Sequence, residues 1–176
     1  MPVVKFTTEA GVELLKPSLD KPTAQYGGEP RYHSGFMVPK SDTKTIQSMR
    51  EAVKKATEDA VNSTWGGQRP AKLNDPIKDG DAKSFDYMHG HYIIDAKTKN
   101  SPRLYHLDGS PASADEFQSG ATVQAELSIF AYNHKGLSMG LGVGIERIWL
   151  VKPSDLRADD NNVAPVQAEN NWSFLN

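Results

Sequence analysis

The chain has no cysteine among its 176 residues, and it contains neither a large net charge nor a long apolar run. Without thiols it can form neither disulfides nor thiolate metal sites, which fits the reducing interior of a cell. No apolar stretch approaches the roughly 20 residues that span a bilayer. The first residues, Met1–Lys5, lack the basic and apolar segments of a secretion signal. We therefore expect a cytoplasmic protein with no membrane partner.

The net charge of -2 argues against a strongly basic nucleic-acid binder, but this charge is unevenly distributed. Residues 153–176 contain four acidic residues and one arginine, so the remaining 152 residues carry a net charge of +1. Any site for an anion must therefore be local. The sequence predicts one domain over 1–152 and a flexible, mildly acidic tail with terminal aromatics over 153–176.

One segment has the period of an α-helix, at about 42–62. Its apolar residues recur at spacings of three and four and so lie on one helix face: Ile46, Met49, Val53, Ala56 and Ala60. Ser41 or Asp42 can cap the first turn. Gly66 and Gly67 follow the last turn, where glycine takes the left-handed conformation that ends helices.

The rest of the chain has the pattern of strands and turns. Prolines at 17, 22, 30 and 39 divide the first 40 residues into short pieces, with one strand over Tyr32–Val38. Later strands are predicted at 85–97, 103–107, 120–133 and 137–151, the last two joined as a hairpin. We expect a mostly β protein, an OB-fold-like five-stranded barrel with one α-helix. A sandwich with an appended helix is the alternative.

The segment Phe85–Tyr92 is the densest aromatic cluster. Strand alternation would place Phe85, Tyr87, His89 and His91 on one face, where rings can stack on successive bases. Alternatively, some of these rings fill the barrel, which we favour for Tyr92. A zinc site at His89 and His91 would need a third ligand, and the spacing indicates none, so no metal site is predicted.

Basic residues follow and are interleaved with further aromatic residues. Cations that track phosphates beside rings that take bases are what a single-strand groove requires. The predicted nucleic-acid-binding residues are Arg31, Tyr87, His91, Lys97, Lys99, Arg103, Tyr105, Tyr132 and Lys135.

Two further patterns in the sequence are candidate sites. The glycines of Gly136–Gly144 lack the Gly-Lys-Ser/Thr of a phosphate loop, so they indicate a sharp bend or the close approach of another backbone. Asp75, Asp79, Asp81 and Asp86 could hold magnesium for a nuclease, although no base stands beside them. A magnesium-dependent nuclease and a structural β-barrel protein are therefore the alternatives to nucleic-acid binding.

The order of several segments resembles a family of phage single-stranded-DNA-binding proteins. These segments are Asp79–Asp81, Gly90–Lys97, Ser101–Arg103, Gly120–Tyr132 and Lys135–Leu141. The resemblance covers roughly residues 30–152. It implies an OB fold, no enzymatic activity, no cofactor, and sequence-independent binding of single-stranded DNA in phage DNA replication and recombination.

Proteins of this kind usually end in an acidic tail with a terminal aromatic, which competes for the DNA groove and recruits replication or recombination proteins. The residues that match are Asp159, Asp160, Glu169, Trp172 and Phe174. This tail is less acidic than is usual for the class. The resemblance places the protein in the host cell cytoplasm, and whether it forms homo-oligomers stays open.

Overall fold

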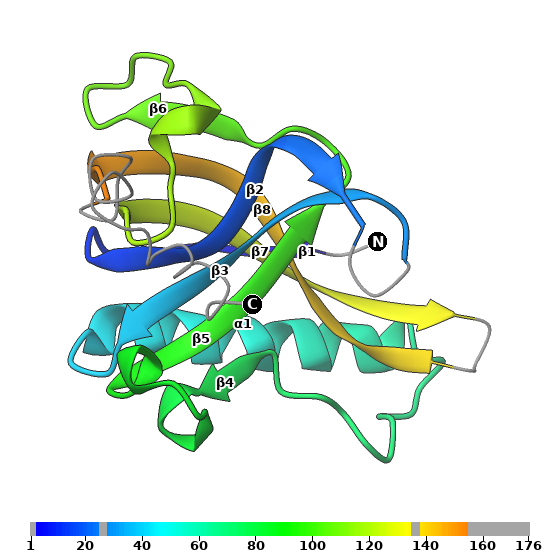
Figure 1. The fold of residues 1–176 in the computed structure, drawn as a ribbon. Coiled ribbons are helices and arrows are strands. Elements are labelled where there is room, and N and C mark those ends of the chain that lie inside the picture. Colours follow the sequence, from blue (N-terminus) through cyan, green and yellow to red (C-terminus); the bar gives the residue numbers. More distant parts are fainter. Residues whose placement is uncertain (1–2, 25–27, 135–137, 155–176) are drawn as a thin grey trace.

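The computed structural model describes residues 3–24, 28–134 and 138–154. Within these ranges the chain forms eight strands, one α-helix and three short 3-10 helices (Figure 1). The strands are β1 (Val3–Thr7), β2 (Val12–Thr23), β3 (Arg31–Pro39), β4 (Ile77–Asp79), β5 (His91–Thr98), β6 (Arg103–His106), β7 (Thr122–His134) and β8 (Ser138–Lys152). The helices are α1 (Thr43–Asn62), η1 (Gly80–Ala82), η2 (Asp86–Met88) and η3 (Ala114–Glu116).

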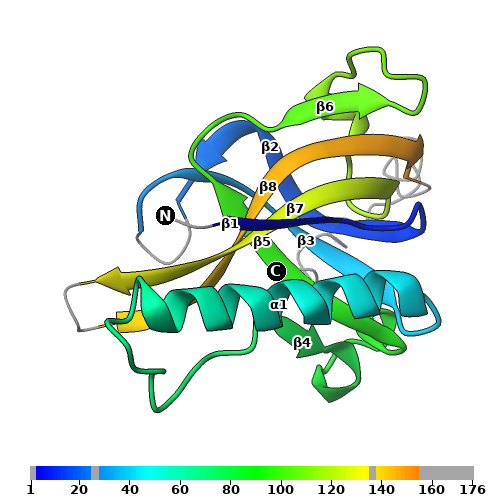
Figure 2. The same ribbon diagram turned by 180° about the vertical axis from the view of Figure 1, so that it is seen from behind.

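The helix α1 confirms the sequence prediction. Asp42 is its N-cap, and the Oδ1 atom of Asp42 accepts a hydrogen bond from the Thr45 amide at 3.1 Å. After the helix, Gly66 and Gly67 have φ values of 64° and 94°, in the region that glycine favours. The apolar face of α1 packs against β1 and β7. Figure 2 shows the helix running alongside the sheet. Of the helices described, none is long and apolar enough to cross a membrane.

The strands form one curled sheet in the order β4-β5-β3-β2-β7-β8-β6, and β1 pairs with another part of β7. The pairs are antiparallel except for β6 with β8. The sheet curls until β5 comes close to β8, but no ladder joins these two strands in the described ranges. The OB-like fold is therefore confirmed, whereas the five-stranded barrel is corrected to an open sheet of eight strands.

The sequence did not predict β2 as one strand, because the prolines in this region indicated only short segments. Pro17 and Pro22 both lie within the 12 residues of β2. Register shifts interrupt its pairing with β3 on both sides of Ser18, and Lys16 has a φ of 49°. These irregularities bend the strand and place the prolines where no regular ladder bond is needed.

The predicted strand over residues 85–97 is wrong in its first half. Residues 86–88 form η2, Gly90 has a φ of 80°, and β5 begins only at His91. The chain turns here because the cap, which we define as residues 80–90, packs on itself. A Cβ atom on Gly80 would lie 2.0 Å from the carbonyl oxygen of Met88. The four rings expected on one strand face therefore do not share one.

The strand β7 separates the core from an outer surface by an alternation of buried and more exposed residues, which only the buried Ser128 interrupts. Its odd-numbered residues from Val123 to Ala131 are buried in the main core, which also contains Phe36, Met49 and Ile148. Among these residues, each valine, leucine or isoleucine contributes about 1.5–3 kcal/mol through burial. The even-numbered residues from Gln124 to His134 lie on the opposite face, which we call the outer face of β7–β8.

Candidate nucleic-acid interface

A pocket of about 620 Å³ lies beside the tip of the β7–β8 hairpin. We call it the hairpin pocket. It is lined by residues from β2, the start of β3 and the loop before it, the segment around β4, β5 and both strands of the hairpin: Thr23, Gly28, Glu29, Arg31, Asn74, Pro76, Lys78, Asp95, Lys97, Phe130, Tyr132, His134, Ser138, Leu141, Gly142 and Val143. Its volume is in the range typical of ligand sites.

Three rings lie in sequence on the outer face of β7 and line this pocket. Phe130, Tyr132 and His134 are two residues apart and therefore share one face of the strand. The rings of Tyr132 and His134 are 5.1 Å apart between centroids. We call these three side chains the ring ladder.

The glycines of β8 make room for the ring ladder. Gly140 pairs with Tyr132, and Gly142 pairs with Phe130. A Cβ atom on Gly142 would lie 2.6 Å from the Phe130 ring, and one on Gly140 would lie 2.7 Å from the Tyr132 hydroxyl. The two rings therefore lie directly across the β8 backbone. The close approach that the glycines were predicted to allow is that of side-chain rings, not of another backbone.

The loop that follows α1 holds the hairpin in position. The Trp65 indole donates a hydrogen bond to the Tyr132 carbonyl at 3.1 Å. The side-chain amide of Asn74 both donates to the Leu141 carbonyl and accepts from the Leu141 amide, each at 3.1 Å. These bonds connect the backbone beside the rings to a loop about 67 residues away in the sequence.

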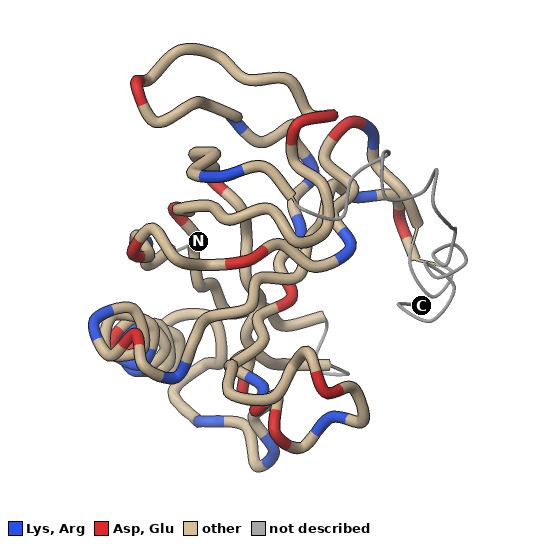
Figure 3. Tube along the Cα trace, turned by 60° about the vertical axis from the view of Figure 1, so that its left-hand side comes forward, with Lys and Arg blue, Asp and Glu red and all other residues tan. Residues whose placement is uncertain are grey.

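The charged residues of the pocket include three cations and two acids. Arg31 is paired with Glu29 at 3.0 Å, whereas Lys78 and Lys97 have no ion pair with any residue that the structure describes. Asp95 is the second acid. Blue and red positions are interspersed along the trace in Figure 3. The positive charge near the ring ladder is therefore a local feature, as the near-neutral net charge requires.

A histidine beside the pocket has a lowered pKa, which favours its neutral form. His33 is opposite Lys97 in the ladder between β3 and β5, and its Nε2 atom is 2.7 Å from the Thr23 hydroxyl. Burial lowers the pKa of His33, an effect that the nearby carboxylate of Asp95 partly opposes. The positive charge at this end of the pocket therefore comes from Lys97 and not from His33.

The structure brings together only some of the predicted site residues. Arg31, Lys97 and Tyr132 line the hairpin pocket. The others lie elsewhere: Tyr87 in η2, His91 at the start of β5, Lys99 in the turn after β5, and Arg103 and Tyr105 on β6. Lys135 and the tail residues lie outside the described ranges.

Two rings and one lysine of the pocket are absent from the residues predicted from the sequence. Phe130 and His134 carry a visible signal, because they alternate with Tyr132 at the spacing of two that places side chains on one strand face. Lys78 carries none, because only the pairing of β4 with β5, in which Lys78 is opposite Ile93, brings it to the pocket that Lys97 also lines. The two rings are therefore visible from the sequence once Tyr132 is identified, whereas the lysine is not.

Tyr87 lies against the protein surface at the cap. Its side chain packs against the small cluster of Leu15, Met37 and Ile93. The Tyr87 hydroxyl is buried without a hydrogen-bond partner among the described residues, and this burial raises the pKa of the Tyr87 phenol. Phe85 stacks on it with ring centroids 5.5 Å apart. These two rings therefore cover an apolar patch of the sheet.

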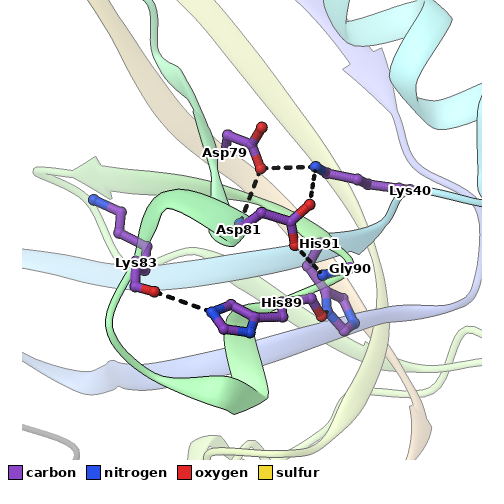
Figure 4. Close-up of polar contacts among 7 residues, drawn as sticks. All are labelled: Lys40, Asp79, Asp81, Lys83, His89, Gly90 and His91. Atoms are coloured by element: carbon purple, nitrogen blue, oxygen red, sulfur yellow. Dashed lines mark hydrogen bonds and ion pairs between the residues drawn. The ribbon is translucent and has the colours of Figure 1, made fainter.

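Three of the four aspartates of the nuclease alternative are paired with a lysine or an arginine, and the fourth, Asp86, is exposed and lies 3.8 Å from the His89 ring. In Figure 4 the Lys40 ammonium lies between Asp79 and Asp81, at 2.7 Å and 2.6 Å from their carboxylate oxygens. Lys40 holds the pKa of both carboxyl groups below the usual range, and they raise the pKa of Lys40. Asp75 pairs with Arg50 at 3.0 Å. The aspartates therefore do not form a shared magnesium site, and the described residues contain no cluster of three metal-ligating side chains.

Comparison with known proteins relates this fold to phage proteins. Residues 9–159 match the profile of the family described as "Enterobacter phage Enc34, ssDNA-binding protein". A putative protein p50 of Acyrthosiphon pisum secondary endosymbiont phage 1 is 30% identical over 144 residues, which cover 74% of this chain and 76% of that protein.

Two solved structures show the same fold. The ssDNA-binding protein of bacteriophage Enc34, in complex with ssDNA, superposes with a TM-score of 0.72 at 20% identity, covering 86% of this chain and 88% of that one. The ssDNA-binding protein gp2.5 of bacteriophage T7 superposes with a TM-score of 0.63 at 14% identity, covering 89% of this chain and 96% of that one.

Proposed function

The chain belongs to the family of the Enterobacter phage Enc34 ssDNA-binding protein, and on this basis we propose that it binds single-stranded DNA in the hairpin pocket. The observation that carries the proposal is the ring ladder, with three rings on one strand face beside lysines that have no ion pair in the described ranges. Membership in the family supports a role in phage DNA replication, with recombination as a related task.

The ring ladder suits binding without sequence preference. Every base has a π-face, so stacking on a protein ring tolerates any sequence and contributes about 1–3 kcal/mol per base. Phe130 and Tyr132 have one side against the glycines of β8, which leaves the opposite side for a base. Because the glycines hold these rings in place, little rotamer entropy is lost when DNA binds.

The cations of the pocket suit the phosphates of the same strand. Lys97 on β5 and Lys78 on β4 line the wall across from the hairpin. Each phosphate neutralised in a single strand releases counterions, which contributes about -0.7 to the slope of log affinity against log salt. Binding of this kind requires no catalytic group or cofactor.

We extend the proposal to the predicted residues outside the pocket. His91 and Lys99 lie at the two ends of β5, from which they can reach DNA that leaves the pocket. For the tail, its acidic residues and its aromatic pair support a surface for replication or recombination proteins.

Fluorescence titration of an oligothymidylate at two salt concentrations tests the proposal. Tyr132→Ala should weaken binding by about 1–3 kcal/mol with an unchanged salt slope, because it removes one stacking ring. Lys97→Ala should make the salt slope shallower by about 0.7, because it removes one phosphate contact. Lys54→Ala on the exposed side of α1 is the matched control and should change neither quantity.

The thermal unfolding of each variant checks that the fold is retained. Unchanged affinity in Tyr132→Ala, together with an unchanged salt slope in Lys97→Ala, would show that DNA does not occupy the hairpin pocket.

A further inference from the structure

A second group of rings lies on the outer face of β7–β8, away from the hairpin tip. Tyr105 on β6 stacks with Trp149 on β8, with ring centroids 6.3 Å apart and planes inclined by 29°. The guanidinium of Arg147 lies 5.6 Å from the centroid of the Trp149 ring. Both rings are half-buried, so part of each reaches the surface.

The strand register places this group on the same face as the ring ladder. Trp149 is opposite Gln124, and Arg147 is opposite Glu126. Gln124 and Glu126 are even-numbered residues of β7, as are the rings at the other end, so all of them face outward. Tyr105 is opposite Trp149 in the parallel ladder with β8 and so continues this face onto β6.

The two groups are separated by a distance that one strand of DNA can span. Gln124 and Tyr132 are eight residues apart on β7, which corresponds to about 26 Å at roughly 3.3 Å per residue. Lys5 of β1 lies between the two groups, because it pairs with Ser128 on the same face. About eight nucleotides cover this distance at the ~3.4 Å per phosphate of a duplex strand, and an extended strand needs fewer.

The chemistry of the second group matches that of the first. Arg103 is exposed, is opposite Arg147 in the ladder between β6 and β8, and has no ion pair with a described residue. Glu126 accepts a hydrogen bond from the Nε atom of Arg147 at 2.8 Å, which holds the guanidinium beside Trp149. A ring pair with an adjacent free cation can take a base and its phosphate.

We propose that Tyr105, Trp149 and Arg103 form a second contact site for the same DNA strand. The strand then runs along the outer face of β7–β8 from the hairpin pocket to β6. This inference rests on the proposed function and adds to it a path and a minimum length of DNA. The position of both ring groups on one face, and the charge of Arg103, which has no ion pair with a described residue, favour DNA as the occupant over a second protein chain.

Affinity measured against oligonucleotide length tests the path. We would titrate oligothymidylates of about 5 and about 16 nucleotides, the latter at the upper end of the range for one OB fold. Trp149→Ala should weaken binding of the long oligonucleotide about fivefold or more and leave the short one unchanged, since the short one is held by the ring ladder alone. Tyr132→Ala should weaken both.

Two further variants keep the test independent of folding defects. Leu107→Ala, an exposed residue next to β6, is the matched control and should leave both affinities unchanged. Trp149→Phe keeps a ring, so it should retain affinity for the long oligonucleotide while losing part of the tryptophan quenching that this DNA causes.

The outcomes separate this inference from the proposed function. Equal losses for both lengths in Trp149→Ala, no loss for either, or a changed oligomeric state without a dependence on length would each overturn the second site. If the unchanged protein binds neither oligonucleotide, the proposed function itself fails, and the second site fails with it.

Discussion

Two aromatic segments of this chain have opposite surroundings. In residues 85–92 the rings are dense in sequence, but Tyr87 packs against the sheet and its hydroxyl is buried. In residues 128–134 the rings are fewer, but they alternate, and they line the hairpin pocket. The number of rings in a segment therefore says less about binding than the strand on which they lie.

Glycine accounts for much of the difference. In the cap, Gly80 lets backbone approach backbone, since its missing Cβ atom would lie 2.0 Å from the Met88 carbonyl oxygen. In the hairpin, Gly142 lets a ring lie across the backbone, since its missing Cβ atom would lie 2.6 Å from Phe130. The same residue type folds one segment onto itself and positions the rings of the other.

The largest effect on folding is expected for Gly80→Ala. The new methyl group meets two backbone carbonyls, of Met88 and His91, which cannot move without opening the cap. We expect a loss of about 3 kcal/mol in the free energy of unfolding, at the upper end of overpacking costs. Urea unfolding measures it. Gly11→Ala is the matched control, because a Cβ atom there meets nothing within 4 Å. Equal stabilities of the two variants would show that the close backbone contact at Gly80 does not hold the cap together.

A smaller effect on stability, but a clear effect on binding, is expected for Gly142→Ala. Its methyl group meets a ring that can shift toward the pocket, so the stability cost should be about 1 kcal/mol. The displaced Phe130 ring should weaken oligothymidylate binding about tenfold, within the value of one stacked base. Titration of this variant beside Gly11→Ala measures the effect. Full affinity in Gly142→Ala would show that the position of the ring is immaterial.

The smallest effect is expected for Tyr87→Phe. The substitution removes a buried hydroxyl that has no hydrogen-bond partner in the described part of the chain, so the free energy of unfolding should rise by up to about 1 kcal/mol. Chemical unfolding measures the change. A loss of stability would instead reveal that the hydroxyl makes a contact. In the unchanged protein the phenol should ionise above its ordinary pKa, because burial disfavours the phenolate.

Periodicity and turn residues in the sequence predicted the elements that short-range interactions determine. The helix α1, with its Asp42 cap, and the hairpin strands β7 and β8 lie close to their predicted bounds, because periodicity and turn residues determine them. The strand β2 and the start of β5 could not be predicted, because bulges and the packing of the cap determine them.

The candidate site was predicted only in part for a similar reason. Tyr132 and Lys97 are visible as an aromatic and a cation on separate strands, but their convergence depends on how the sheet curls. Lys78 enters the pocket through the three-residue strand β4, which has no distinct pattern in the sequence. Long-range pairing, and not residue type, decides which predicted residues meet.

The amide of Asn74 has one more consequence, for association between molecules. The backbone N–H and C=O of Leu141 point away from β7, and on an open sheet such groups can pair with a strand of another chain. Because the Asn74 side chain bonds to both of them, it takes the place of a neighbouring strand at this position. A single side chain thus satisfies backbone groups at the edge of the sheet that could otherwise take part in intermolecular β-pairing.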